Sequence, residues 1–421
     1  MMEKRDGYKK TKIGWIPEGW DLKKIGDLFE LSSGKTPSRK KTNYYSLGTI
    51  PWVKTADLNN SYIKLTDERI TEVAAKECSM KILPRQTVLI AMYGGFNQIG
   101  RTGILGVPAA TNQAMTALLP NKENSSEFLN YYLITFRNNW RDVATSSRKD
   151  PNITKKDVQN FYLRLPPLTE QKKIASILTT VDDKISSIEN QIQQTEQLKK
   201  GLMEKLLTEG IGHTEFKDTK IGRIPEAWDV VNINTVSVRK SGHTPNRKIP
   251  EYWNGGIKWV SLADSFRLDT RYLNETEYNI SEAGIDNSSA VKLEEGTVII
   301  SRDAGIGKST IINEEMAVSQ HFIAWKCSDT LFNLFLFYLL QKWKPKFERI
   351  ANGTTIKTIG LDFFKKMVIP LPPIEEQEQI ATILSTVDDK IEILNQKKSQ
   401  YQTLKKGLSQ QLLTGQMRVK I

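Results

Sequence analysis

The 421-residue sequence predicts a mixed α+β (α/β) fold built from two similar globular domains, each followed by a long helix. Three features support this prediction. The sequence repeats once at a period of about 207 residues, each copy begins with short strand-like runs separated by turn residues, and each copy ends in a segment with coiled-coil spacing. Such a period is too long for a solenoid unit and indicates two copies of one domain-plus-helix unit.

The repeat is clearest in three pairs of segments. The pairs are residues 11–21 with 219–229, 33–37 with 241–245, and 165–185 with 371–391. Nine of eleven positions are identical in the first pair, and 15 of 21 are identical in the last. Because the offset drifts only from 208 to 206 residues, the two copies are collinear.

The first part of each copy predicts strands and one shorter helix. Thr87–Ile90 and Thr297–Ile300 are β-like runs bounded by turn residues. Amphipathic helices are expected near Phe128–Trp140 and Leu331–Trp343. We therefore divide the chain into four segments, which are globular residues 1–165, helical residues 166–210, globular residues 211–371 and helical residues 372–421.

The second part of each copy predicts one long helix, at about residues 169–207 and 375–413. Pro-Pro precedes each helix and a glycine, Gly210 or Gly415, follows it, which are typical start and stop signals. Apolar residues recur in steps of four and three, the spacing of a coiled-coil seam. The seam residues are Ile174, Leu178, Val181, Ile185, Ile188 and Ile192 in the first helix and Ile380, Leu384, Val387, Ile391 and Leu394 in the second.

At 1.5 Å per residue, each helix is roughly 58 Å long. An apolar seam of this length is unfavourable when exposed to water. We expect the two helices to pair in one rod, and the alternative is a core stripe of an ordinary helical bundle. A second set of leucines is expected to extend the apolar face, namely Leu198, Leu202 and Leu206 and their counterparts Leu404, Leu408 and Leu412.

Composition excludes several classes of protein. The longest apolar run, Leu331–Leu340, is about half the length of a membrane span, and the N-terminus lacks the apolar segment of a secretory signal. The two cysteines and three histidines show no zinc-like spacing. A disulfide framework and a metal site are therefore not expected, and a cytoplasmic protein is favoured.

The net charge of +12 favours an anionic partner, and it is unevenly distributed. Residues 1–165 carry +10 and residues 211–371 carry +2, while the helical segments are nearly neutral. Since Lys and Arg side chains that neutralise phosphates supply much of the affinity for nucleic acid, we expect the globular domains, and mainly the first, to bind it.

Polar loops in both domains combine basic side chains with hydroxyl, amide or aromatic groups, which suits phosphate anchoring and base-edge readout. The alternative for each loop is an ordinary solvated surface. The candidate residues in the first domain are Lys35, Ser38, Arg39, Lys40, Lys41, Tyr93, Arg101, Asn112, Gln113, Arg148, Lys149 and Lys155. Those in the second domain are His243, Asn246, Arg247, Lys248, Arg302, Lys308, Gln320 and Lys357.

Motifs that suggest enzymatic chemistry are incomplete. Gly305–Ser309 resembles a phosphate loop, but Arg302 stands where the pattern requires a glycine, and residues 95–102 lack the lysine. A turn between strands is the preferred interpretation. The pairs Asp182-Asp183 and Asp388-Asp389 lie on the helices beside the seam, so we interpret them as surface acids or a protein-docking face.

Two variable globular domains, each followed by Leu-Pro-Pro-x-x-Glu-Gln-x-x-Ile-Ala-x-Ile-Leu-x-Thr-Val-Asp-Asp-Lys-Ile, resemble the specificity subunit of type I restriction-modification systems. The Ile-Pro-Glu-x-Trp motif at residues 16–20 and 224–228 and the Asn112-Gln113-Ala114 segment also fit, as do Lys-Lys-Gly-Leu and Leu-Leu-Thr near each helix end. The resemblance covers essentially the whole chain. One departure is Ser319-Gln320-His321, which replaces Asn112-Gln113-Ala114 in the second copy.

The resemblance implies two target recognition domains, each reading one half of a bipartite, asymmetric DNA site, and helices that form an antiparallel coiled coil and set the gap. It also implies docking of two adenine-methylating modification subunits, which recruit the restriction (nuclease-translocase) subunits, and no catalysis or cofactor in this chain. Two like readers on one duplex should be related by a pseudo-two-fold axis, which agrees with antiparallel helices. Different side chains in corresponding loops predict two different half-sites.

Two other classes of function remain open. The first is a DNA methyltransferase or nuclease with its own catalytic site, for which we find no complete motif. The second is a purely structural coiled-coil protein, which would not retain DNA in a sequence-dependent way.

Overall fold

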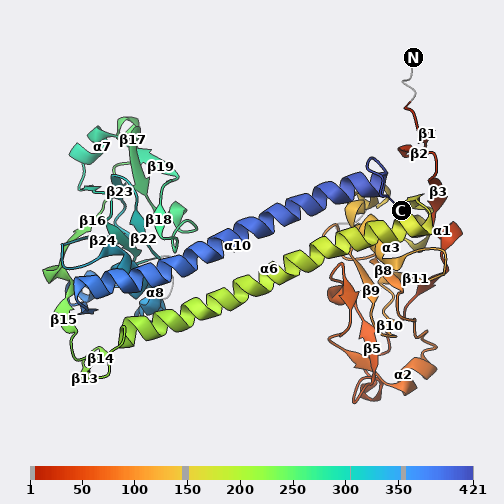
Figure 1. Cartoon of the computed structure of the whole chain (residues 1–421), viewed down its shortest axis with the longest axis horizontal. Coiled ribbons are helices and arrows are strands. Elements are labelled where there is room, and N and C mark those ends of the chain that lie inside the picture. Colours follow the sequence, from red (N-terminus) through yellow and green to blue (C-terminus); the bar gives the residue numbers. More distant parts are fainter. Residues whose placement is uncertain (1–4, 145–150, 304, 352–356, 421) are drawn as a thin grey trace. The chain divides into compact units, whose positions relative to one another are not determined.

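The computed structural model describes residues 5–144, 151–303, 305–351 and 357–420 (Figure 1). Its contacts divide the chain into two compact units, residues 1–189 with 396–421 and residues 190–395. Each unit therefore contains one globular domain, part of the long helix that follows it and part of the other long helix. The two units are described one at a time.

The first domain is built around a five-stranded sheet in the order β4-β11-β8-β9-β6, and a second sheet has the order β10-β5-β7. The strand predicted at residues 87–90 is confirmed as β8, which is fully buried because it lies between β11 and β9. The elements are β1 (Tyr8–Thr11), β2 (Gly14–Pro17), β3 (Asp21–Lys24), α1 (Ile25–Leu28), β4 (Leu31–Ser33), β5 (Ile50–Val53), β6 (Tyr62–Ile63), β7 (Arg69–Ile70), α2 (Glu72–Glu77), β8 (Val88–Ala91), β9 (Thr102–Leu105), β10 (Ala110–Thr111), β11 (Met115–Leu118), α3 (Ser126–Thr135), α4 (Trp140–Val143), α5 (Lys155–Asn160) and β12 (Tyr162–Leu165).

The second domain repeats this plan with sheets β16-β24-β21-β22-β18 and β19-β17-β23-β20. The strand predicted at residues 297–300 is confirmed as the central strand β21. The elements are β13 (Phe216–Thr219), β14 (Gly222–Pro225), β15 (Asp229–Asn232), β16 (Ser237–Ser241), β17 (Trp253–Val260), β18 (Tyr272–Leu273), β19 (Tyr278–Ile280), α7 (Glu282–Asp286), β20 (Lys292–Leu293), β21 (Val298–Ser301), β22 (Ser309–Ile312), β23 (Met316–Val318), β24 (Phe322–Cys327), α8 (Asn333–Ile350), α9 (Leu361–Lys365) and β25 (Val368–Leu371).

The shorter helices α3 and α8 are buried on two faces rather than one, unlike the amphipathic helices that the sequence predicts. All residues from Leu334 to Leu340 are buried in α8. The reason is that α8 packs on β21 and β22 and also shares a core with the long helices of its unit. Helix α8 also continues through Pro345 to Ile350, beyond the predicted end, because the fully buried Phe347 anchors its last turns.

The two long helices are α6 (Leu168–Glu209) and α10 (Ile374–Thr414), within one or two residues of the predicted bounds. In the first unit, Asp182 pairs with Lys405 at 2.6 Å and Glu189 pairs with Lys398 at 2.8 Å. Residue numbers rise along one helix as they fall along the other, so the helices run antiparallel in this unit. In the second unit Lys199 pairs with Asp388 at 2.6 Å, and the N–H of Ile211, just beyond α6, donates to Glu376 near the start of α10 at 2.8 Å, so the helices are antiparallel here as well.

The predicted seam residues are buried or half-buried in the described structure. The expected extension through Leu198 and Leu404 is wrong, because these side chains are 53% and 48% exposed. Continuing the four-and-three spacing from Ile192 leads instead to the buried Thr195 and then to Lys199, which pairs with Asp388. The seam therefore includes ion pairs, and the leucine spacing alone was misleading.

Across the helices that the structure describes, none has an apolar stretch long enough to cross a membrane. Among the same residues, no group of three His, Cys, Asp or Glu side chains is placed to hold a metal ion.

Candidate nucleic-acid interface

Several of the predicted loops meet at one end of the central sheet of the first domain. Met92, which follows β8, donates its backbone N–H to Ala114 at 2.8 Å and accepts from Ile153 at 3.0 Å. The backbone N–H of Lys35 donates to Thr111 at 2.9 Å. The sheet order therefore brings the segments around residues 35, 93, 113 and 153 together.

The same convergence occurs in the second domain. The N–H of Arg302 donates to the carbonyl of His321 at 3.0 Å, and Ile359 donates to the carbonyl of Arg302 at 2.9 Å. His243 donates to Val318 at 3.1 Å. Each domain thus carries one cluster of loops on an equivalent scaffold, and loop residues on such a scaffold can vary without changing the fold.

The Ser-Gly-x-Thr-Pro loop is held against a neighbouring strand by close backbone contact. A Cβ atom on Gly34 would lie 2.0 Å from the carbonyl oxygen of Thr111, and one on Gly242 would lie 1.6 Å from that of Val318. Only glycine fits this approach. The glycine therefore fixes the backbone, while the next side chain, Lys35 or His243, stays exposed and differs between the domains.

Tryptophan residues secure this loop from the other sheet. The indole N–H of Trp52 donates to the carbonyl of Lys35 at 3.2 Å, and that of Trp259 donates to the carbonyl of His243 at 3.1 Å. Both tryptophans are buried. The loop conformation is thus set by the fold and not by the exposed side chain that it presents.

A threonine and an exposed glutamine are hydrogen-bonded in each domain. The hydroxyl of Thr36 donates to Oε1 of Gln113, and the hydroxyl of Thr244 donates to Oε1 of Gln320 at 2.6 Å. The threonine restrains the amide through its oxygen and does not occupy its NH2 group, which suits hydrogen bonding to a base edge. Thr36 and Thr244 were not among the predicted residues, although their repeated Thr-Pro signal is visible in the sequence.

The residues beside the glutamine differ between the domains. In the second domain His321 lies 3.4 Å from the amide nitrogen of Gln320, and its Nδ1 lies 2.5 Å from Asp303. Asp303 also accepts a hydrogen bond from Thr358. In the first domain Ala114 occupies the position of His321, so the shared glutamine lies in two different polar environments.

Arg39 and Arg247 stack on aromatic rings. The guanidinium carbon of Arg39 lies 4.5 Å from the ring centroid of Tyr45 and 5.3 Å from that of Trp52. Arg247 lies 5.6 Å from Trp253 and 5.7 Å from Tyr278. Stacking of this kind orients a guanidinium and favours phosphate or base recognition over a freely moving cation.

Glu68 restrains Arg39 in the first domain. Arg39 donates two hydrogen bonds to its carboxylate, at 2.5 and 3.0 Å, and Lys54 donates a third at 2.6 Å. The hydrogen bonds from Arg39 and then Lys54 lower the pKa of Glu68 to about 2. Lys41 similarly donates to Glu77 and to Tyr44. The charges of Arg39 and Lys41 are therefore partly neutralised.

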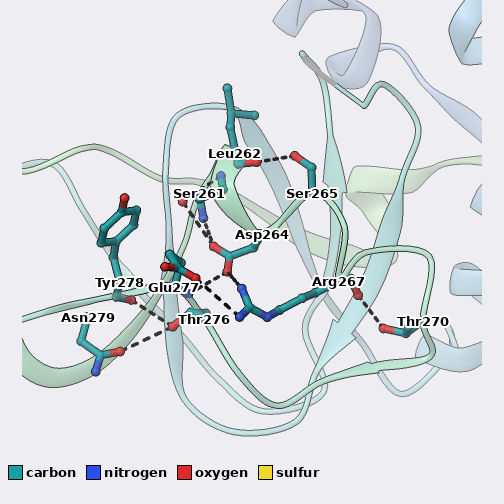
Figure 2. Close-up of polar contacts among 11 residues, drawn as sticks. Ser261, Leu262, Asp264, Ser265, Arg267, Thr270, Thr276, Glu277, Tyr278 and Asn279 are labelled. Carbon is teal, nitrogen blue, oxygen red and sulfur yellow. Dashed lines mark hydrogen bonds and ion pairs between the residues drawn. The ribbon is translucent and has the colours of Figure 1, made fainter. Parts of the chain in front are cut away.

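In the second domain a buried aspartate organises the corresponding region (Figure 2). Asp264 accepts hydrogen bonds from the backbone N–H of Ser261 at 2.9 Å and of Glu277 at 2.8 Å. Arg267 donates to the same carboxylate at 2.8 Å and lies 3.6 Å from Glu277 (Figure 2). Because Asp264 is fully buried, these donors are needed to compensate its charge.

This cluster supports two of the predicted cations. Tyr278, on which Arg247 stacks, directly follows Glu277 (Figure 2). Lys308 donates to the backbone carbonyl of Ser265 at 2.7 Å. In the second domain Asp264 thus fixes the backbone of Glu277 beside Tyr278, and Lys308 is held by the nearby carbonyl of Ser265.

The glycine turns that resemble phosphate loops are turns between strands, as predicted, and they pack against helices. A Cβ on Gly100 would lie 2.3 Å from Trp140, and one on Gly307 would lie 3.3 Å from Phe347. Arg101, after the first turn, donates to the carbonyl of Leu58.

The remaining predicted residues have varied surroundings. Arg302 donates to the carbonyl of Ile359 at 3.0 Å, Lys35 donates to that of Cys78 at 2.9 Å, and Lys155 donates to that of Leu31 at 2.9 Å. Tyr93, Ser38, Lys40, Asn246, Lys248 and Lys357 are exposed, and Asn112 accepts from the N–H of Ala114. Arg148 and Lys149 lie outside the described residues, as do residues 352–356 of one predicted loop.

The Asp-Asp pairs of the long helices form contacts between each domain and the helices. The hydroxyl of Tyr131 donates to Asp182 at 2.8 Å, and that of Tyr338 donates to Asp388 at 2.7 Å. Interpreting the first aspartate of each pair as a free surface acid was therefore wrong, because each already binds a tyrosine and a lysine. The docking role of these pairs stays a prediction. The second aspartates, Asp183 and Asp389, are both exposed, and Asp389 also pairs with Arg271.

The Glu-Gln pair at the start of each helix also joins domain to helix, and all four side chains are buried except Glu376, which is partly buried. Glu170 accepts from the indole N–H of Trp20 at 2.9 Å, and Glu376 accepts from that of Trp228 at 2.9 Å. Gln171 accepts from the N–H of Ser125, the residue that caps α3. The most strongly repeated sequence motifs thus connect domain to helix.

Comparison with known proteins identifies the family. The model of the type I restriction modification DNA specificity domain matches residues 17–197 and 225–402. The MjaX specificity subunit of a type I restriction enzyme from Methanocaldococcus jannaschii is 30% identical, over 99% of this chain and 98% of the relative. The MjaVIII specificity subunit from the same organism is 28% identical, over 99% and 97%.

Solved structures share the fold. A chain from a study of complex assembly and conformational transition of the type I R-M system aligns with a TM-score of 0.62 at 17% identity, over 96% of this chain and 99% of the other. The S subunit of a type I restriction-modification system from M. genitalium aligns with a TM-score of 0.55 at 15% identity, over 94% and 96%. With the family model matched in both halves, the chain belongs to the type I restriction-modification DNA specificity family.

Proposed function

We propose that this chain is the DNA sequence-specificity subunit of a type I restriction-modification complex, in which each domain reads one half of a bipartite, asymmetric DNA site. One observation carries the proposal. In both domains a threonine on the same glycine-anchored loop is hydrogen-bonded to a glutamine of another segment, while the neighbouring exposed side chains differ. A shared frame with different side chains is what two readers of different half-sites require.

The two long helices would set the gap between the half-sites. Their antiparallel pairing within each unit and the Tyr–Asp bonds to the domains support this role. A stiff helical pair converts its length into spacing, whereas a flexible linker would tolerate many spacings.

The same helices would scaffold two modification subunits, which methylate adenine, and restriction subunits would join through these. The chain itself would perform no chemistry and need no cofactor. We infer a cytoplasmic location from this role, because the substrate is chromosomal or invading DNA.

The decisive experiment is co-expression with the modification subunits, followed by mapping of methylated adenines in the host genome. A bipartite motif with two different halves is expected. Replacing residues 219–371 with those of a relative should change one half only, and the matched replacement of residues 11–165 should change only the other. Methyl transfer by the purified chain alone would refute the proposal.

The role of the helices needs a separate test. A seven-residue insertion after both Glu189 and Asn395 preserves the seam spacing and should widen the gap without altering either half. The control is the same insertion in one helix only, which should disrupt pairing and abolish methylation. An unchanged gap in the double insertion would contradict the role of the helices.

A further inference from the structure

A pocket of about 240 Å³ in the first domain is lined by cationic and aromatic side chains, among them Phe96, Arg137, Trp140 and Arg141. We propose that this pocket binds a phosphate group of the DNA backbone. The inference rests on the proposed function and goes beyond it, because it assigns a phosphate subsite to residues outside the predicted set.

Within the described part of the chain, the pocket carries positive charge that is not paired with an acid. Burial, followed by the charges of Arg101 and Arg141, lowers the pKa of Arg137. Among the described residues, no carboxylate lies within 4.0 Å of these three guanidinium groups. Like charges held together are unfavourable unless an anion joins them.

Arg137 and Arg141 are held in place by the protein. Arg137 donates to the carbonyl of Ile99 at 2.8 Å and to that of Asn97 at 2.9 Å, which leaves further N–H groups of its guanidinium for a ligand. Arg141 lies 5.1 Å from the ring centroid of Phe96. A fixed, planar guanidinium matches the geometry of a phosphate.

Trp140 adds a donor beside these arginines. Its side chain is 1% exposed, and its indole N–H has no hydrogen-bond partner within the described part of the chain. The place for a Cβ on Gly100 lies 2.8 Å from this nitrogen and 3.0 Å from the side chain of Arg137. The unpaired indole N–H and the side chain of Arg137 thus both lie against Gly100.

The second domain has the same architecture, but at the position that corresponds to the pocket an acid is present beside the helix cation. Asn60 and Asp269 occupy the same turn, with φ of 62° and 69°. Asn60 donates its N–H to Thr102 at 2.8 Å, and Asp269 donates to Ser309 at 3.0 Å. The turn residue is therefore a neutral amide in the first domain and an acid in the second.

The cations on the helices differ between the domains in the same way. Lys344 of α8, which contacts Gly307 as Arg137 contacts Gly100, pairs with Asp269. Phe347 replaces Trp140 and has no N–H to satisfy, and Glu348 follows it where Arg141 follows Trp140. The cationic pocket is thus specific to the first domain, which also carries most of the net charge.

The position of the pocket favours a DNA phosphate over a free one. Phe96 and Asn97 belong to the loop that follows Tyr93 at the end of β8, within the cluster of candidate reading loops. Phosphate contacts beside reading loops fix the register of a protein on DNA.

The test uses the full chain, with its modification subunits, and a duplex of random sequence. Asn60→Asp and Arg141→Glu each install the residue type that the second domain already accommodates at the corresponding place. One lost phosphate contact should reduce the slope of log K against log salt by about 0.9, which is about an eightfold loss at 0.1 M salt. The matched control is Lys122→Glu, an exposed residue outside the pocket with the same change of charge as Arg141→Glu.

Unchanged binding by both Asn60→Asp and Arg141→Glu, or an equal loss in Lys122→Glu, would overturn the pocket assignment while leaving sequence-specific reading intact. A wild-type complex that fails to bind DNA would overturn the proposed function as well. If inorganic phosphate protects residues 96–101 from hydrogen exchange but the variants bind DNA normally, the pocket takes free phosphate and the DNA assignment is wrong. In the reverse direction, the double variant Asp269→Asn, Glu348→Arg should steepen the salt dependence.

Discussion

The hydroxyl of Tyr131 donates a 2.8 Å hydrogen bond to Asp182, and Lys405 of the antiparallel helix binds the same carboxylate at 2.6 Å. One aspartate thus joins a globular domain to both helices of its unit. The second unit repeats the arrangement with Tyr338, Asp388 and Lys199. The strongly repeated Asp-Asp-Lys motif is therefore a joint between parts of the protein.

Replacing Tyr131 with Phe should weaken this joint. The variant leaves the ring packed but removes a bond to a charged acceptor, for a loss of about 1–2 kcal/mol, since Lys405 still satisfies Asp182. Hydrogen exchange should quicken in α3 and in the adjoining part of α6. Tyr338→Phe is the matched control and should affect only the second unit. An exchange pattern that is the same in both variants would contradict this prediction.

Removing the Glu170 carboxylate should lower the free energy of unfolding more than Tyr131→Phe does. The carboxylate is fully buried and accepts from Trp20 at 2.9 Å and from Arg418 at 2.7 and 2.9 Å. Glu170→Ala leaves a buried N–H and a guanidinium without an acceptor, for a loss of about 3 kcal/mol. This loss of stability can be measured by urea unfolding, monitored by hydrogen exchange in the first unit. Trp20→Phe, which keeps the ion pair, should lose less, and the reverse order would refute the explanation.

Stability at acid pH should depend on Glu68. Because Arg39 and Lys54 lower its pKa from 4.5 to about 2, the folded state favours the charged carboxylate. The stabilisation is present above pH 4.5 and is lost as the pH falls toward 2. Glu68→Gln should therefore unfold at a lower temperature than wild type at pH 6, and the difference should vanish near pH 2. The exposed Glu72→Gln serves as control, and a difference that grows on acidification would contradict the sign.

The Thr–Gln pairs should control one half-site each. Thr36→Val removes the hydrogen bond that restrains Gln113, so discrimination at one base pair should weaken by about 1–3 kcal/mol. Mapping of methylated sites should then show a relaxed position in one half of the motif, and Thr244→Val should relax the other half. Thr36→Ser keeps the hydroxyl and should restore specificity, which separates positioning from packing. Relaxation of both halves by a single variant would be inconsistent with this role.

Much of the architecture follows from local sequence patterns. The repeat, the helix bounds and the central strands β8 and β21 are confirmed because hydrophobic spacing and the Pro and Gly signals depend on neighbouring residues. The seam beyond Ile192 was less predictable, since leucine spacing suggested Leu198, whereas the continued seam runs through Thr195 and Lys199.

The site depends on contacts between residues far apart in the sequence. The candidate residues could be named from composition, but their partners, such as Thr36 with Gln113 and Arg39 with Glu68, are set by strand order. The cationic pocket was missed for the same reason, since Arg137 and Arg141 look like ordinary helix residues until their neighbours are known.

The sequence by itself determined that this protein has two copies of one domain-plus-helix unit, with the positive charge mainly in the first. Only the tertiary structure decided which charges remain uncompensated. Asp269 pairs with the helix cation Lys344, whereas Asn60, in the same turn of the first domain, carries no charge that could pair with a helix cation. Charge compensation depends on distance in space, which the order of residues along the chain does not specify.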